Sequence, residues 1–286
     1  MKYRSQELAA AQGKDSTTLA WCMRITARDG TVLARSSVDV SVTLDGVAYD
    51  PVDGFSPFAI QQTADLAVQN SEVVGFLLSQ GIDEADILGG RWDGAAVLLF
   101  EADYTNPAAG GMILQSGTLG NLSTARLTYS AEFRGLAQAL QQTVGRVYAK
   151  GCDATFGDAR CKIDAKALTV SGTVTAVTDR RSFLDAARAE VEDYFGAGLI
   201  TWTSGANDGY SMEVSSFAVG GAFVLSLPMP SNIAVGDTYE ATPGCRKRFE
   251  EDCRLKYANW VNFRGMPKVP GSDRILGLGG KSGSGA

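Results

Sequence analysis

The sequence predicts a mainly β protein, a β-rich α+β chain, that is divided into two domains. Three observations lead to this prediction. At 286 residues, the chain is about twice as long as a typical single domain. Most apolar residues fall in short runs rich in β-branched side chains, and turn-forming pairs such as Asp-Gly separate these runs. Helical spacing is confined to a few short segments.

The first domain is predicted to span residues 1–149 and to be rich in β-structure. Residues 5–12 have the composition of a short helix, and strand-forming residues begin in the segment 17–26. Asp29-Gly30 and Asp45-Gly46 separate strand-like runs, and Asp-Gly favours the two-residue turn of a hairpin. The first fifty residues are therefore expected to form a β-meander.

The rest of this domain alternates between short helices and strands. Residues 82–90 begin with acidic residues and end in glycines, which predicts a short helix with a left-handed C-terminal end. A strand is expected at 94–104, followed by strands at 111–118 and 122–134, where apolar and polar residues alternate. Residues 136–148 change to helical spacing, and this change predicts the end of the domain.

The second domain is predicted at residues 150–275. Within it, the insert 165–240 consists of short strand-like runs with the spacing of a small β-barrel or sandwich. The turns of the insert are predicted at Ser171-Gly172, Asn207-Asp208-Gly209 and Gly220-Gly221. Residues 276–286 are rich in glycine and serine, which predicts a flexible tail.

Composition excludes several classes of function. The chain contains no histidine, which removes the Ser-His-Asp and Cys-His nucleophile systems and His-ligated zinc hydrolases. Its net charge of -6 gives no reason to expect nucleic acid as a partner. Its start lacks the apolar core of a secretion signal, and polar residues interrupt the uncharged stretch 214–236, so no transmembrane helix is expected.

Four of the five cysteines bracket the insert. Cys152 and Cys161 precede it with C-x8-C spacing, and Cys245 and Cys253 follow it with C-x7-C spacing. A bond between the two pairs would hold the ends of the insert together. Cys22 lies alone in a strand-like run and is interpreted as a small buried hydrophobic residue.

The spacing leaves several chemistries open for these four thiols. Disulfides require an oxidising compartment, and zinc sites with four thiolates usually have shorter spacings. An iron-sulfur cluster suits ligands from separate, longer loops. Residues 243–275 carry a local charge of +4, which would lower thiol pKa values and offset the charge of a thiolate-ligated cluster. Cluster, zinc, disulfides and unreactive thiols all remain possible on the residues alone.

The cysteine segments carry a specific resemblance. GCDATFGDARC (Gly151–Cys161) and the segment from Gly244 to Asp273, which begins GCRKRFEEDC, resemble the iron-sulfur tail-tip hub proteins of long-tailed bacteriophages and gene transfer agents. Upstream, the segments 44–55, 87–104 and 131–148 are similar to the N-terminal part of the same family. The resemblance covers nearly the whole chain except the Gly/Ser tail.

The resemblance implies a structural virion component with no enzymatic activity, and its N-terminal domain, 1–149, would have a tube-like β fold. Three copies would form a homotrimeric ring between the distal tail protein, on the tube side, and a central fibre or penetration protein. The chain would assemble in the host cytoplasm and then reside at the tail tip. By position, Cys152, Cys161, Cys245 and Cys253 would each ligate one iron of a [4Fe-4S] cluster.

Six further residues near the cysteines have a predicted role. Gly151 and Gly244 would let the backbone approach inorganic sulfide, or are ordinary turn glycines. The other four are expected to form an aromatic and amide lid, or a plain packing helix: Asn259, Trp260, Asn262 and Phe263.

Two other functions remain as alternatives at this point. An iron-sulfur electron-transfer protein or oxidoreductase would use the same four thiols, although four cysteine ligands leave no iron open to a substrate. A disulfide-stapled extracellular binding module is the second alternative.

Overall fold

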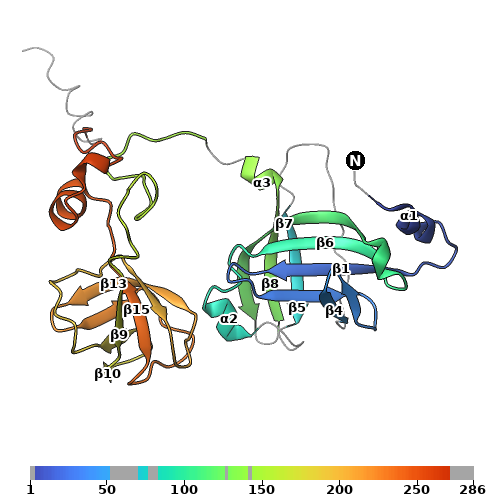
Figure 1. The fold of residues 1–286 in the computed structure, drawn as a ribbon, viewed down its shortest axis with the longest axis horizontal. Coiled ribbons are helices and arrows are strands. Elements are labelled where there is room, and N and C mark those ends of the chain that lie inside the picture. The colour runs from blue at the N-terminus through green and yellow to red at the C-terminus, as the bar shows by residue number, and fades with distance from the viewer. Residues whose placement is uncertain (1–3, 52–69, 77–82, 126–127, 141–143, 271–286) are drawn as a thin grey trace, which may run out of the picture. The chain divides into compact units, whose positions relative to one another are not determined.

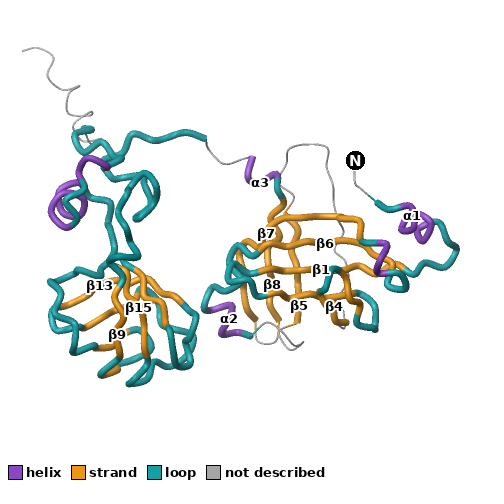
Figure 2. The backbone as a smooth tube through the Cα atoms, viewed as in Figure 1, coloured by secondary structure: helices purple, strands orange, loops and turns teal. Residues whose placement is uncertain are grey.

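The computed structural model of the chain describes residues 4–51, 70–76, 83–125, 128–140 and 144–270. The chain divides into two compact units, Met1–Thr143 and Val144–Ala286. This division falls a few residues before the predicted domain boundary at 149. Each unit contains one main β-sheet, so the prediction of a mainly β fold is confirmed (Figures 1 and 2). The predicted tail, 276–286, lies outside the described residues.

The first unit is built on a sheet of eight strands. In spatial order the strands run β3-β4-β2-β1-β6-β7-β8-β5. The strands are β1 (Leu19–Thr26), β2 (Val32–Ser36), β3 (Val42–Leu44), β4 (Val47–Pro51), β5 (Asn70–Phe76), β6 (Ala96–Asp103), β7 (Gly111–Ala125) and β8 (Thr128–Gly135). The helices are α1 (Gln6–Gln12), α2 (Glu84–Leu88), the short 3-10 helix η1 (Pro107–Ala109) and α3 (Ala137–Leu140).

The central strands of this sheet bury both of their faces. In β1, Ala20 and Cys22 pack into one core cluster, and Met23 and Ile25 pack into the other. Successive side chains of a strand point to opposite faces, so both sets are buried only if both faces are covered. This double burial explains why β1 and β6 are nearly continuous apolar runs.

The predicted β-meander is wrong in its order. Asp45 and Gly46 do form a tight hairpin turn, with φ values of 50° and 77°, and β3 pairs with β4 across it. However, β4 then pairs in parallel with β2, through Arg35 opposite Asp50, so β3 becomes the edge strand. The hairpin contributes Val42, Leu44 and Tyr49 to a core cluster of this unit.

The two predicted N-terminal helices are confirmed, and their ends have clear causes. Ser5 caps α1, because its Oγ accepts a hydrogen bond from the Leu8 N–H at 3.2 Å. At the end of α2, Gly90 adopts a left-handed φ of 71° and donates its N–H to the carbonyl of Ile87. The next N–H reaches Asp86 O, which completes a Schellman motif.

The predicted helix at 136–148 is largely wrong. Among the residues of this segment that the structure describes, the turn α3 alone is helical, and residues 144–149 are non-helical with exposed side chains. Val144 is 97% exposed and Gly145 has a φ of 135°, which a helix does not allow. An amphipathic helix is stabilised mainly by burial of its apolar face, and Val144, Val147 and Tyr148 bury little of their side chains.

The insert in the second unit forms a sheet of seven strands. Its spatial order is β10-β11-β14-β13-β12-β15-β9, and all its pairings are antiparallel. The strands are β9 (Val170–Thr173), β10 (Ala176–Val177), β11 (Ser182–Leu184), β12 (Leu199–Trp202), β13 (Ser211–Ala218), β14 (Ala222–Leu225) and β15 (Thr238–Thr242). The short strands predicted for this region are therefore confirmed.

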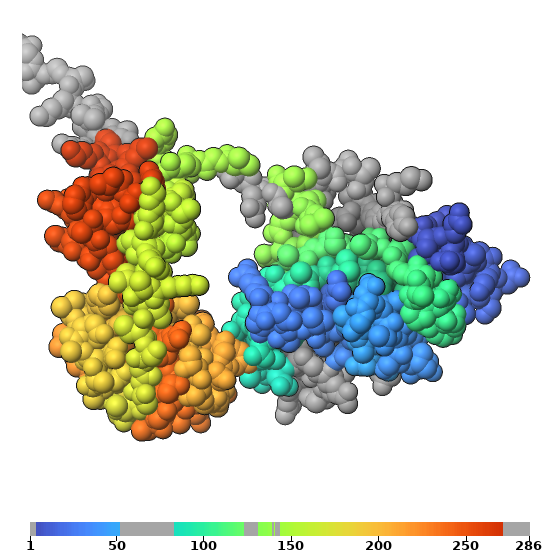
Figure 3. Space-filling model, viewed as in Figure 1, coloured from blue at the N-terminus to red at the C-terminus, as the bar shows by residue number. Residues whose placement is uncertain are grey.

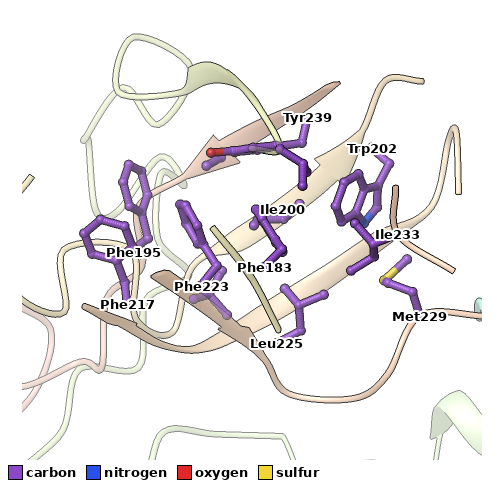
Figure 4. Packing of buried hydrophobic residues seen from close by; sticks show 13 residues of the cluster. Phe183, Phe195, Ile200, Trp202, Phe217, Phe223, Leu225, Met229, Ile233 and Tyr239 are labelled. Atoms are coloured by element: carbon purple, nitrogen blue, oxygen red, sulfur yellow. The ribbon is translucent and has the colours of Figure 1, made fainter. Parts of the chain in front are cut away.

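The seven strands enclose a single aromatic core (Figure 4). Phe183 of β11 contacts Tyr239 of β15 at a ring separation of 5.3 Å, although several strands separate them in the sheet. The sheet therefore curls around the core. Gly172, predicted in a turn, lies instead within β9, where a Cβ atom would come within 2.4 Å of the Tyr239 ring.

The chain after the insert forms two short helical segments. The first is the π-helix η2 (Phe249–Lys256), and the second is the 3-10 helix η3 (Trp260–Asn262). In the part of the chain that the structure describes, no helix has the length and apolar character to cross a membrane.

Candidate metal centre

The structure brings the four predicted cysteines together. Cys152, Cys161, Cys245 and Cys253 line one small pocket with a cavity volume of about 20 Å³. All five cysteines of the chain carry free thiols. Cys22 is fully buried in the first unit, so the interpretation of this residue as a core side chain is confirmed.

The segments on either side of the insert build this pocket. In Figure 3 the chain before the insert (yellow-green) and the chain after it (red) lie against each other. The backbone N–H of Cys152 donates to Lys247 O at 2.9 Å, and the Arg146 guanidinium donates to Arg264 O at 2.9 Å. These bonds place the two pairs of cysteines together although more than eighty residues separate them.

Asp158 shapes the loop that carries the first two cysteines. Its carboxylate accepts hydrogen bonds from the N–H groups of Cys161 at 2.6 Å, Arg160 at 2.9 Å and Thr155 at 2.9 Å. These bonds, above all that from Cys161, lower the pKa of Asp158 and keep it ionised. Lys162 follows with a φ of 63°, which turns the chain away after the thiol.

Lys247 shapes the backbone after the third cysteine. Its φ of 64° lies in the left-handed region, which side chains other than glycine rarely adopt. In this conformation the Lys247 N–H donates to the Cys245 sulfur at 3.4 Å, while its carbonyl accepts from Cys152. Strained backbone of this kind gathers at functional sites, where the surrounding structure holds it in place.

The π-helix η2 carries the fourth cysteine. The Cys253 N–H donates to Arg248 O at 3.1 Å and the Tyr257 N–H to Asp252 O at 3.1 Å, both across five residues. The buried carboxylate of Asp252 accepts from the Arg248 N–H at 3.0 Å and fixes the first turn. Such widened helical turns are rare and frequently lie at functional sites.

The predicted lid over the thiols is present in part. Asn259, Asn262 and Phe263 line the pocket. The Asn259 amide donates to Cys161 O at 2.7 Å and lies 3.9 Å from the Cys161 sulfur. Trp260 does not belong to the lid, because its side chain is half exposed beside Phe249 on a different surface.

Two glycines allow the backbone segments to pack closely around the pocket. A Cβ atom on Gly244 would lie 1.9 Å from the carbonyl carbon of Ala197, and one on Gly265 would lie 2.3 Å from Gly151 O. The predicted Gly244 therefore serves the contact between backbone segments of the second unit. The role of Gly265 is not predicted from the sequence, because a glycine between Arg264 and Met266 forms no recognisable pattern.

The thiols lie in an environment that disfavours bare thiolates. Burial, followed by the charges of the other thiols, raises the pKa of Cys253 to about 11. Burial also raises the pKa of Cys245, and Asp252 adds to the effect. The prediction that nearby basic residues lower these pKa values is therefore wrong for Cys245 and Cys253, because desolvation by burial is the largest effect on both and raises the pKa.

The four thiols are nevertheless suited to bind a metal that prefers soft sulfur ligands. Ala154, Phe156 and Ile163 give the pocket apolar walls, and the Arg264 N–H donates to the Cys152 sulfur at 3.4 Å. Hydrogen bonds to sulfur and an apolar surrounding are the means by which proteins tune thiolate-bound metals. Among the described residues, no three His, Cys, Asp or Glu side chains are arranged to hold a single metal ion. The fit of the four thiols to a metal group therefore concerns a cluster, in which each thiol binds a different iron, and not a site for one ion.

Comparisons with known proteins show which family this architecture represents. Residues 5–164 match the family described as baseplate hub protein, N-terminal attachment domain, and residues 193–273 match a conserved hypothetical phage protein family, BR0599. Together, the two matches include all four pocket cysteines. No curated protein matches the chain.

A solved structure resembles the whole chain. It is a protein chain from the virion of a native gene transfer agent particle, with 33% sequence identity and a TM-score of 0.83. The alignment covers 98% of this chain and 98% of that one. These matches confirm the predicted resemblance to phage and gene-transfer-agent proteins as far as the baseplate hub family and the virion chain are concerned. This chain therefore belongs to the family of phage baseplate hub proteins, and it is a structural component of a phage-type tail or baseplate.

Proposed function

We propose that this protein is the hub at the tail tip of a phage or gene-transfer-agent particle. It links the distal end of the tail tube to the central fibre or penetration protein, and three copies form the ring at this junction. The alignment with the gene-transfer-agent virion chain, which covers nearly all of both chains, supports a role in the particle. The role is structural, and no catalytic step is assigned to the chain.

We also propose that Cys152, Cys161, Cys245 and Cys253 hold a [4Fe-4S] cluster. The observation that carries this proposal is the pocket itself, because two segments from opposite ends of the insert contribute all four of its thiols. The Cys152 and Cys245 sulfurs accept backbone hydrogen bonds from Arg264 and Lys247, and such bonds stabilise a ligated thiolate. When bound, the cluster supplies four iron-thiolate bonds that cross-link the two segments.

The cluster would stabilise the second unit by closing a long loop. A link between Cys161 and Cys245 closes a loop of roughly 84 residues, for which the chain-entropy model gives about 4 to 5 kcal/mol. This contribution is comparable to the net stability of a typical domain, about 5 to 15 kcal/mol. A purely structural role therefore accounts for the cluster.

Metal analysis of the full-length protein tests the cluster. Protein purified anaerobically is expected to be brown, with iron and acid-labile sulfide each near four per chain. Cys152→Ser and Cys253→Ser are expected to lose most of both, whereas Cys22→Ala, which removes the thiol outside the pocket, retains them. Colourless protein with one zinc per chain, or equal iron loss in Cys22→Ala, would contradict the assignment.

Labelled particles test the hub. A tag that electron microscopy can locate is added to the subunit, and the label is expected at the distal end of the tail, in threefold arrangement. Label along the tube or on the capsid would rule out the tail-tip position. This test is independent of the cluster, since particles can be imaged whatever their metal content.

A further inference from the structure

A second pocket adjoins the cysteine segments and is rich in basic side chains. It has a volume of about 470 Å³ and is lined by side chains from three segments of the second unit, around residues 150, 246–251 and 267–268. Five of its side chains are basic: Lys150, Arg246, Lys247, Arg248 and Lys268. Two are acidic, Glu250 and Glu251, and we call this feature the basic pocket.

Both arginines of the basic pocket are already paired with carboxylates. Arg246 pairs with Asp193 of the insert, and Arg248 pairs with Glu251. Glu250 pairs with Arg254 at 2.9 Å, so neither acidic residue of the pocket is available to a lysine without breaking an ion pair.

Three lysines of the basic pocket lack such a partner. Lys150, Lys247 and Lys268 are exposed, and none forms an ion pair with another residue of the described ranges. Three neighbouring ammonium groups around one pocket form a site for a group with several carboxylates. Since the rest of the chain is strongly acidic, the long-range field opposes a long polyanion such as nucleic acid.

A complementary acidic segment lies on the first unit of the same chain. Asp83 and Glu84 begin α2, and both side chains are exposed. Among the described residues, they are the one pair of adjacent acidic side chains in which neither member forms an ion pair or hydrogen bond. Leu88, at the other end of the same helix, is 57% exposed.

We propose that the basic pocket of one copy receives the α2 segment of a second copy of this chain. Asp83 and Glu84 pair with Lys150 and Lys268, and Leu88 packs against the apolar surface of Phe249 and Pro267. Because the pocket and α2 are different surfaces, each copy offers one of each. Such head-to-tail contacts form a ring when the rotation from copy to copy closes, and an open filament when it does not. This inference rests on the proposed hub function and supplies the contact that would form its ring.

Charge reversal in the full-length, anaerobically purified protein tests the contact. Lys150→Glu/Lys268→Glu and Asp83→Lys/Glu84→Lys are each expected to weaken self-association at least about tenfold, because like charges then face each other. A protein that carries all four substitutions restores attraction with the signs exchanged and is expected to associate like the wild type. Sedimentation velocity at low and high salt measures the association constants.

Two matched controls keep the result specific. Lys166→Glu and Asp39→Lys change equally exposed charges outside the pocket and α2, and both are expected to leave the association constant within about twofold of wild type. Failure of the four-residue exchange to restore association overturns the proposal. Wild-type protein that remains monomeric at all concentrations would also overturn the proposal, since two copies would then form no contact.

These outcomes can be separated from failure of the proposed function. Iron content and tail-tip labelling report on the hub and its cluster, whereas recovery by charge exchange reports only on this contact. Normal iron content and tail-tip labelling without recovery would therefore reject the contact and leave the hub function standing.

Discussion

At the scale of single residues, Cys22 differs from the pocket thiols in what it can contact. Its side chain is fully buried in β1, opposite Phe100 of β6 and Ser36 of β2. Burial raises the pKa of Cys22 to about 11, against an ordinary value of 9.0. The thiol therefore stays protonated in the folded chain over a range of pH in which the unfolded chain loses the proton.

This shift predicts a loss of stability at high pH. Because the folded pKa is raised, the stabilisation is complete below about pH 9 and is lost as pH rises toward 11. A shift of this size corresponds to about 2 to 3 kcal/mol in the free energy of unfolding. Urea unfolding at pH 8 and pH 11 measures the decrease in wild type and in Cys22→Ala.

The alanine variant isolates the thiol from other alkaline effects. Burial also raises the pKa of Tyr49, so part of the decrease is expected in both proteins. The decrease should be smaller in Cys22→Ala by about 2 kcal/mol, although this variant starts from a lower stability at pH 8. Identical pH dependence in the two proteins would show that the Cys22 thiol does not titrate in this way.

Single residues also show where sequence reasoning about the site reached its limit. Cysteine spacing was sufficient to nominate the four thiols that line the pocket. Asp158, Lys247 and Gly265 were missed, because their roles depend on backbone geometry: three N–H groups converging on a carboxylate, a positive φ, and a close approach to Gly151. None of these features has a distinctive residue pattern.

At the scale of secondary-structure elements, Lys256 joins η2 to the insert. Its ammonium group donates to Tyr194 O at 2.5 Å and to Gly244 O at 2.8 Å, and it lies over the rings of Tyr194 and Tyr257. Burial lowers the pKa of Lys256, and the charge of Asp252 opposes this effect. One side chain thus connects the helix that carries Cys253 with the loop before β12.

Replacement of this lysine is predicted to destabilise the second unit. Lys256→Met keeps most of the side-chain volume but removes the donor to Tyr194 O and one of the two donors to Gly244 O, which also accepts from the Tyr257 hydroxyl at 2.7 Å. The loss is expected to cost about 1 to 3 kcal/mol. Urea unfolding of the full-length protein, followed by tryptophan fluorescence and compared with the wild type, measures this loss. Lys166→Met, which changes an exposed lysine of the same unit, is expected to cost less than about 0.5 kcal/mol. A loss equal to that of Lys166→Met would show that the two bonds do not stabilise the unit.

Elements were predicted well where local patterns decide them and poorly where distant packing does. The strands β1 and β6 and the glycine end of α2 follow from runs of strand-forming residues and from turn glycines. The parallel pairing of β2 with β4 and the loss of the helix at 144–148 do not follow from such patterns. The strand pairing depends on which other strands lie beside β2, and a helix at 144–148 would need an apolar surface to pack against. Both depend on residues elsewhere in the chain.

At the scale of the whole molecule, charge is distributed unevenly over an acidic chain. The net charge is -6, yet the segment after the insert is basic and supplies most of the basic pocket. Net charge governs long-range attraction, whereas local clusters govern which surfaces meet. An acidic particle component can therefore avoid nonspecific contact with nucleic acid and still present a basic site to an acidic surface.

The sequence by itself determined the mainly β class, the short strands of the insert, the four cysteines and the family they resemble. These features depend on residue type and short-range spacing, which the chain carries wherever it is placed. Only the tertiary structure decided that the four thiols line one pocket and that burial raises the pKa of Cys245 and Cys253. It also decided that three lysines meet in the adjoining basic pocket without an ion-pair partner among the described residues. Such properties arise from groups far apart in the chain, and folding alone sets their distances and their exposure to water.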